Sequence, residues 1–239
     1  MGGLEETLVK GAAEIGIDLS QEQVGQFKEY YRILHEASKN INLTSILEEK
    51  EVAVKHFIDS LSCLLAGSFD DGKHLMDIGT GAGFPGIPLK IYRPGLKVTL
   101  IESVEKKVFF LENLISRLKL DKIEVVHARA EDIGRSRVQR ESCDRVVSRA
   151  VASLAVLAEY CLPVLKVGGF FMAMKGPRLE EELKLAENAF RILGGRLEEV
   201  LHLKLPFTGD ERKLVLLRKI RPTPGQYPRR AGIPQKKPL

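Results

Sequence analysis

The sequence predicts an α/β fold: a mostly parallel sheet with helices on both faces, a helical cap before it and an antiparallel hairpin at one edge. Helical spacing without a strand pattern fills the first 70 residues. From Lys73 onward, short strand-like runs alternate with helical segments, and such an alternation implies a parallel sheet. The last two strand-like segments, 197–205 and 212–219, are joined by a turn around Gly209, which predicts an antiparallel pair.

Helices are expected throughout the front of the chain. The first has an apolar face, and Ser20 is a suitable N-cap for the second. The expected apolar positions of these two helices are Leu4, Leu8, Ala12 and Ile15, then Val24, Phe27, Tyr31 and Leu34. A third helix is expected over 48–65. We therefore divide the chain into a helical cap (1–70), a core (71–220) and a tail (221–239).

The core alternates regularly. Strands are expected at 73–78, 97–102, 122–127, 143–148 and 169–174. Helices are expected at 86–92, 104–119, 153–165 and 178–193. In such a sheet, ligands bind where the parallel strands end.

Composition narrows the class of protein. No apolar run reaches the ~20 residues that a membrane helix needs, and no secretory signal is visible, so we expect a cytoplasmic protein. The cysteines, Cys63, Cys143 and Cys161, are far apart and predict reduced thiols, with no metal site. The net charge of +5 is compatible with a polyanionic partner.

The tail is basic and rich in proline. Residues 221–239 hold five of the eleven prolines and no acid. This composition predicts that the tail forms neither a helix nor a packed core, and that Arg229 and Arg230 can lie along phosphates. The alternative is a disordered tail that only adds solubility.

A glycine-rich loop follows the first expected strand. Asp77 ends that strand, and Gly79, Gly81, Gly83 and Gly86 follow it. Such glycines let the backbone approach a ligand closely. The spacing from Gly81 to Gly86 also fits a dinucleotide site, but an acid at the loop entrance would repel a pyrophosphate, and Pro85 and Pro88 disturb the helix start on which a pyrophosphate sits. S-adenosylmethionine (SAM), which carries an amino group and a sulfonium, suits the loop better.

Neighbouring strand ends supply further candidate cofactor contacts. Glu102 would accept hydrogen bonds from ribose hydroxyls, and Ala130 with Glu131 would flank an adenine. Phe84 would pack beside the sulfonium, or else be a core aromatic. Arg149 would lie near the transferred methyl group, and the alternative is an ion pair with an acid such as Asp77. This layout is that of class I SAM-dependent methyltransferases, which have a Rossmann-like sheet.

Several short motifs together resemble a known family. They are Asn42-Leu-Thr44, His56-x-x-Asp59-Ser60, Ser148-Arg149-Ala150 and Lys175-Gly176, read with the glycine loop. The chain resembles the bacterial 16S (small-subunit) ribosomal RNA guanine-N7 methyltransferases, also called glucose-inhibited division protein B. The tail, from Pro224 to Pro234, is similar to tails of family members from Gram-positive-type bacteria.

The resemblance implies methyl transfer from SAM to N7 of a guanine in the decoding region of 16S rRNA, with the small ribosomal subunit as partner. We expect the enzyme to be a monomer. By position, its SAM contacts fall on Gly79, Phe84, Ala130, Glu131 and Arg149. Guanine N7 carries a lone pair and no proton, so we assign no catalytic base. The residues expected to shape the face where the base enters are Asn42, Thr44, His56, Asp59 and Ser60, and the candidate RNA contacts in the core are Lys175 and Arg212.

Two other classes of function remain open. A SAM-fold assembly factor without transferase activity would keep the basic tail but tolerate loss of the loop that Asp77 and Gly83 delimit. A methyltransferase acting on another RNA or on a small molecule would keep the loop, but small-molecule enzymes bury their substrate under an apolar lid. The polar, basic ends of this chain argue against such a lid.

Overall fold

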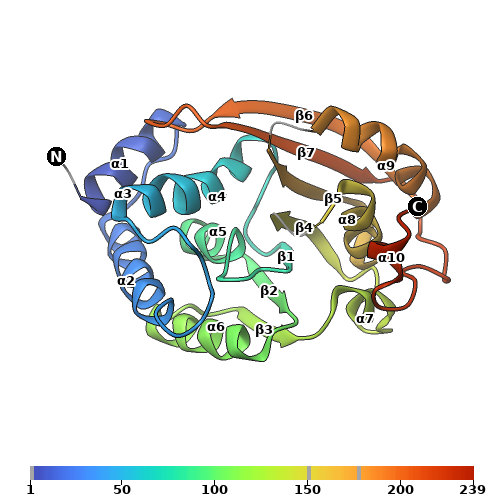
Figure 1. The fold of residues 1–239 in the computed structure, drawn as a ribbon, viewed down its shortest axis with the longest axis horizontal. Helices are drawn as coiled ribbons and strands as arrows, with labels where there is room; N and C mark the ends of the chain where they lie inside the picture. The colour runs from blue at the N-terminus through green and yellow to red at the C-terminus, as the bar shows by residue number, and fades with distance from the viewer. Residues whose placement is uncertain (1–2, 150–151, 177–178) are drawn as a thin grey trace.

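The computed structural model describes the whole chain except residues 1–2, 150–151 and 177–178 (Figure 1). A seven-stranded sheet runs through the middle in the order β3-β2-β1-β4-β5-β7-β6. The strands are β1 (His74–Ile78), β2 (Lys97–Glu102), β3 (Ile123–His127), β4 (Cys143–Arg149), β5 (Leu165–Lys175), β6 (Gly195–Lys204) and β7 (Glu211–Lys219). The first five are parallel to one another, and β7 is antiparallel to both β5 and β6, as predicted.

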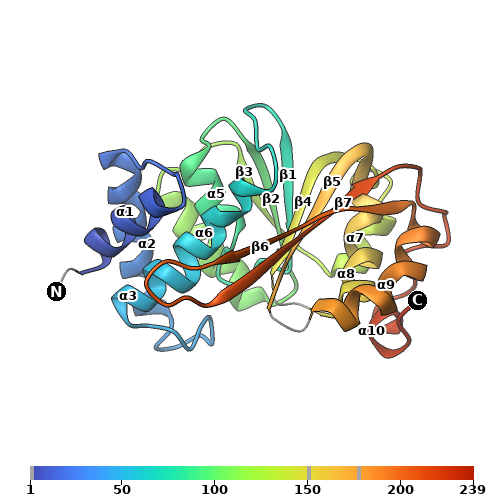
Figure 2. The ribbon, with the colours of Figure 1, turned by 90° about the horizontal axis from the view of Figure 1, so that it is seen from above.

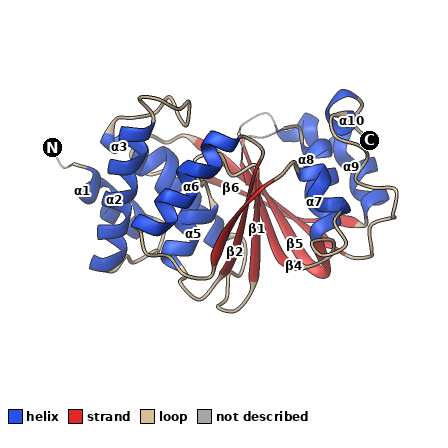
Figure 3. Cartoon of the chain, turned by 90° about the horizontal axis from the view of Figure 1, so that it is seen from below, coloured by secondary structure: helices blue, strands red, loops and turns tan. Residues whose placement is uncertain are grey.

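Helices cover both faces of the sheet (Figure 3). The helices are α1 (Leu4–Glu14), α2 (Gln21–Ala37), α3 (Glu49–Val52), α4 (Asp59–Leu61), α5 (Gly86–Tyr92), α6 (Glu105–Arg117), α7 (Ala130–Arg135), α8 (Leu154–Cys161), α9 (Leu179–Leu193) and α10 (Ile233–Lys236). Those from α1 to α6 lie on one side, and α7 to α10 lie on the other, so the two termini are on opposite sides of the sheet (Figure 2). The predicted fold class is confirmed.

Each face of the sheet has its own hydrophobic core. Phe27 of α2 and Leu111 of α6 pack with Leu100 of β2 on one face. Leu157 of α8 and Leu193 of α9 pack with Phe171 of β5 on the other. The helices before β1 therefore share a core with one face of the sheet, which fixes their position on that face.

The helix expected over 48–65 is continuous but irregular. Its α-helical pieces, α3 and α4, flank a π-helical segment at Ala53–Ile58, and a 3₁₀ turn at Ser62–Leu65 follows. π-Helical turns are uncommon and often lie at functional sites. This one carries His56, whose neighbours are described below.

The prediction that the tail forms neither a helix nor a packed core is wrong. A further helix, α7, lies where the sequence predicts none. Residues 221–239, which we call the C-terminal strap, pack against the domain and include the short helix α10. Thr223 and Pro234 of the strap are buried. Proline does not prevent this packing because Arg140 donates hydrogen bonds to the strap's carbonyl groups, which proline retains.

Candidate active site

The glycine loop lies at the carboxyl end of β1, where the strand order reverses between β2 and β4. Gly79, Gly81 and Gly83 have φ angles of 71°, 62° and 103°. These angles are in the left-handed region that favours glycine, which explains the residue type at each position. The Gly79 amide donates to the Ile101 carbonyl, so the loop reaches over the end of β2. The loop therefore lies at the topological switch point, where open α/β sheets bind ligands.

Asp77 supports this loop from below. One oxygen, Oδ2, accepts hydrogen bonds from Thr80 Oγ1 at 2.7 Å and from the Gly86 amide at 2.9 Å. The other oxygen, Oδ1, is buried and has no hydrogen-bond partner among the described residues. Burial raises the pKa of Asp77 to about 6, so the carboxylate is mostly ionised at pH 7. Asp77 thus offers a buried acceptor beside the loop.

A cavity of about 310 Å³ opens beside the loop. It is lined by Ile78, Gly79, Ile101, Ser103, Ala128, Arg129, Ala130, Glu131, Tyr160, Gly232 and Gln235. Three of the expected cofactor contacts, Gly79, Ala130 and Glu131, therefore meet in one place. The ends of β1, β2 and β3 supply one side of the cavity, while α8 and the C-terminal strap supply another.

Glu102 connects the glycine loop to the end of β2. Its Oε2 accepts a hydrogen bond from the Gly81 amide at 3.0 Å, and its Oε1 accepts from the amides of Ser103 and Val104 at 2.8 Å each. The side chain is 5% exposed and stands between Ile101 and Ser103, which both line the cavity. The carboxylate is held at the cavity edge by these three amides.

Phe84 belongs to an aromatic stack rather than to an open surface. Its ring stacks on that of Tyr30, with centroids 5.2 Å apart and planes 10° from parallel. It also stacks on the ring of His56, with centroids 4.7 Å apart and planes 19° from parallel. The side chain is buried, as the core-aromatic alternative expected. The Tyr30 hydroxyl donates to the Ala82 carbonyl at 2.6 Å, which ties α2 to the glycine loop.

Arg149 joins the stack to a buried ionic cluster. Its guanidinium lies 4.8 Å from the centre of the Phe84 ring and donates to Asp59 Oδ2 at 3.0 Å. Arg212 donates to the other oxygen of Asp59, also at 3.0 Å. Arg149 therefore forms the ion pair with an acid that the alternative expected, but the acid is Asp59 and not Asp77. Asp59 comes from a helix far away in sequence, which no local pattern indicates.

His56 is a neutral member of this cluster. Its Nδ1 is 3.1 Å from the Lys55 carbonyl, so it donates there, and its Nε2 accepts from Thr44 Oγ1 at 2.8 Å. Burial, then the charge of Arg149, lowers the pKa of His56 to about 3. His56 therefore carries no charge at neutral pH.

The remaining residues expected at the base-entry face have different surroundings. Asn42 is exposed in the turn before α3. Thr44 donates a hydrogen bond to His56, which ties this turn to the following helix. Ser60 is fully buried and donates to the His56 carbonyl, so it does not face the entrance.

The candidate RNA contacts are mostly engaged within the protein. Lys175 donates to Glu182 at 2.7 Å and to the Ala152 carbonyl at 2.6 Å, and Arg212 is bound to Asp59. Arg229 pairs with Glu159 at 2.6 Å. Arg230 is exposed on the strap and remains the most accessible of the four.

Sequence reasoning missed several residues of this region. Tyr30, Tyr160, Gly232 and Gln235 come from three helices or their flanks, and only tertiary packing brings them to the loop. The signal for Tyr30 was present in the helical spacing of α2, where the expected apolar position was Tyr31. Tyr30 is fully buried, whereas Tyr31 is half-buried.

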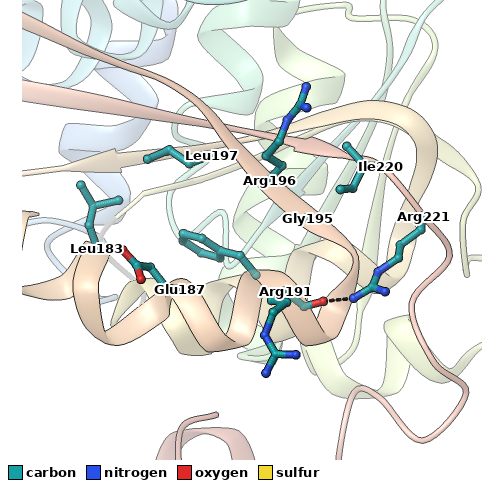
Figure 4. Close-up of a pocket in the computed structure, with 9 residues that line it drawn as sticks. Leu183, Glu187, Arg191, Gly195, Arg196, Leu197, Ile220 and Arg221 are labelled. Atoms are coloured by element: carbon teal, nitrogen blue, oxygen red, sulfur yellow. Dashed lines mark hydrogen bonds between the residues drawn. The ribbon is translucent and has the colours of Figure 1, made fainter.

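Other features of the surface lie away from this region. A groove of about 500 Å³ between α9 and the start of β6 is apolar at its base and has Arg191, Arg196 and Arg221 around it (Figure 4). It lies at the β6 edge of the sheet, whereas the glycine loop follows the interior strand β1. Within the described ranges, no cluster of three or more His, Cys, Asp or Glu is arranged to hold a metal ion. None of the described helices combines the length and apolarity needed to cross a membrane.

Comparison with solved structures agrees with the fold. TYW2 from M. jannaschii, in complex with AdoMet, is 18% identical, with a TM-score of 0.52 over 63% of this chain and 71% of that chain. TrmN from Thermus thermophilus is 18% identical, with a TM-score of 0.55 over 80% of this chain and 53% of that chain. At these identities the likeness concerns the fold alone.

Comparison of sequences is more specific. Residues 23–215 match the family model described as rRNA small subunit methyltransferase G. The ribosomal RNA small subunit methyltransferase G of Pelotomaculum thermopropionicum is 59% identical over all 239 residues, and that of Desulforamulus reducens is 51% identical, with complete coverage of both chains in each case. The match to the family model and the relatives' identities confirm the expected resemblance: this chain belongs to the family of ribosomal RNA small subunit methyltransferase G.

Proposed function

We propose that the chain transfers a methyl group from SAM to N7 of a guanine in the decoding region of 16S rRNA. The observation that carries the proposal is that two candidate sites, one for the cofactor and one for the base, adjoin the same glycine loop. The cavity beside Gly79 lies on one side of the glycine loop, and the cluster of Phe84, His56 and Arg149 begins at its other end. A cofactor and a base held on the two sides would be brought together by the same few residues.

The residues of the cavity and of the adjoining glycine loop suit SAM. The unpartnered Asp77 Oδ1 is an acceptor for an amino group, and the space around Gly81, where an added Cβ would meet nothing within 4 Å, is open for a ligand. Glu102 offers carboxylate oxygens to ribose hydroxyls, and Ala130 with Glu131 would flank the adenine. Bound SAM supplies an electrophilic methyl group on its sulfonium.

The protein's contribution to the reaction is placement. Because guanine N7 has a free lone pair, no side chain needs to remove a proton, and the neutral His56 fits that requirement. The buried stack of His56 and Phe84 would hold this end of the glycine loop in shape, and the partly exposed Arg149 beside it would hold RNA phosphate or base oxygens. A guanine within a folded RNA would have to leave its stack to reach this region.

The substrate would be the small ribosomal subunit or its RNA, so we propose that the enzyme works in the cytoplasm. We also propose that it acts as a monomer, because the cavity and the aromatic cluster are both built from one chain.

The test is methyl transfer from labelled SAM to small subunits that lack their native methylation, with naked 16S rRNA and large subunits in parallel. Borohydride and aniline then cleave RNA at N7-methylguanine. A single cleavage in the decoding region of 16S rRNA supports the proposal. Binding of SAM without label in any RNA would overturn it and favour an assembly factor, and label in a different RNA would reassign the substrate.

A further inference from the structure

The C-terminal strap reaches the cofactor cavity. It leaves the end of β7, the neighbour of the edge strand β6, and ends at α10, which packs against α8 (Figure 1). Gly232 and Gln235, both in or next to α10, line the cavity. A segment whose composition suggested a loose basic arm therefore forms part of the cavity wall.

Arg140 fixes the first half of the strap. Its guanidinium donates to the carbonyl groups of Thr223, Pro224 and Tyr227, at 2.6, 3.2 and 2.7 Å. Three carbonyls bound to one planar group define the path of the chain closely. Arg140 thus holds the strap against the α7 side of the domain.

A buried ion pair fixes the second half. Glu159 of α8 is fully buried, and its two oxygens accept from Arg229 Nε at 2.9 Å and from Nη2 at 2.6 Å. The Arg229 amide also donates to Glu159, at 2.8 Å. A buried carboxylate needs such partners, so docking of the strap satisfies an acid that would otherwise be buried alone.

The last connection lies inside the cavity wall. The Gly232 amide donates to Glu131 Oε1 at 2.8 Å, and Glu131 is one of the expected cofactor contacts. Gln235 lies three residues further along the chain and is exposed. Its side chain forms no hydrogen bond with another described residue. Its amide can donate and accept at the rim of the cavity.

We propose that the C-terminal strap is a functional wall of the cofactor site, in which Gln235 contacts bound SAM and Gly232 holds Glu131 in its binding position. This inference rests on the proposed function, since it assumes that the cavity binds SAM. It makes docking of the strap and binding of the cofactor mutually favourable, because each stabilises the same arrangement of Glu131.

The experiment compares matched variants of the full-length protein by titration calorimetry with SAM. Gln235→Ala should raise the Kd for SAM by about threefold to tenfold, the worth of one net hydrogen bond. Gln226→Ala is the control, because Gln226 is exposed on the same strap and does not line the cavity. It should bind SAM as the wild type does.

Hydrogen exchange of the wild-type protein provides a second readout. SAM should slow exchange of the amides at 232–236, and Arg229→Gln should speed that exchange and weaken SAM binding together. Unchanged affinity of Gln235→Ala, with exchange of the strap insensitive to SAM, would overturn the inference while leaving the cofactor site intact. A wild-type protein that binds no SAM would overturn the proposed function as well, which distinguishes the two failures.

Discussion

Arg149, at the end of β4, donates to Asp59 on α4 across 3.0 Å. The two residues are 90 positions apart, and their side chains are 16% and 5% exposed. The pair joins the helices that precede the sheet to the edge where the glycine loop lies. Arg212, from the closing hairpin, binds the same carboxylate, so three distant parts of the chain meet at one acid.

We expect Asp59→Asn to lower the free energy of unfolding by about 3–5 kcal/mol, because it leaves the partly buried Arg149 without its counter-charge and Arg212 with only Asp210, 3.9 Å away. Urea denaturation measures this change. The control is Glu6→Gln, which breaks an exposed ion pair with Lys10 and should leave the stability nearly unchanged. Equal effects of the two substitutions would show that the Asp59 cluster has no special structural role.

SAM affinity should depend on pH through Asp77. The pKa of this carboxyl is about 6 in the folded protein, so it becomes protonated as the pH falls below that value. A protonated acid attracts an amino group less, and the Kd for SAM should therefore rise as the pH falls from 7 to below about 6. Calorimetry over this range checks the trend, and Asp77→Asn should abolish it. A pH-dependent Kd in that variant would assign the effect to another group.

Because of His56, the free energy of unfolding should decrease as the pH falls. The pKa of His56 is about 3 in the folded protein, against 6.5 for an ordinary histidine. Between these values the unfolded chain binds a proton that the folded one does not, so His56 lowers stability as the pH falls, by at most about 1.4 kcal/mol per pH unit. His56→Asn should remove this contribution.

The wild type and the His56→Asn variant have to be compared directly, because Asp77 acts in the opposite sense. Its pKa is raised from 3.8 to about 6, so the folded protein holds the extra proton between those values, and stability from this group falls as the pH rises through them. Both proteins share that contribution, and it cancels in the difference. Equal slopes of stability against pH would contradict a neutral, buried His56.

How far sequence reasoning reached depended on whether a feature is local. The alternation of strands and helices depends on residues that are neighbours in sequence, so it was predicted. The glycine loop at the end of β1 depends on such neighbours as well, and it was predicted for the same reason. The partner of Arg149 and the packing of the strap were not, because Asp59 and Glu159 each meet an arginine from a distant part of the chain. Composition described the strap as basic and rich in proline, but the buried acid that binds Arg229 lies 70 residues earlier.

Gly81→Asp should abolish SAM binding and leave the fold intact. Gly81 has φ +62° and an added Cβ would meet nothing within 4 Å, so the side chain enters the space proposed for the ligand. Gly16→Asp is a matched control, since Gly16 has φ +74° and equally open surroundings at the end of α1. Both substitutions carry the same backbone strain, and only Gly81→Asp should lose SAM in calorimetry. Loss of binding in both would point to strain rather than to the site.

Arg230→Gln should weaken binding to 16S rRNA without changing the Kd for SAM. Arg230 is exposed on the strap, whereas its neighbour Arg229 is held by the buried Glu159, so only Arg230 is free to meet a phosphate. Loss of one phosphate contact should reduce the slope of log K against log salt by about 1. Filter binding over a range of salt concentrations measures this slope. Because Arg229→Gln releases the strap, it should weaken SAM binding as well, and an unchanged salt slope in Arg230→Gln would restrict the strap to its role at the cofactor site.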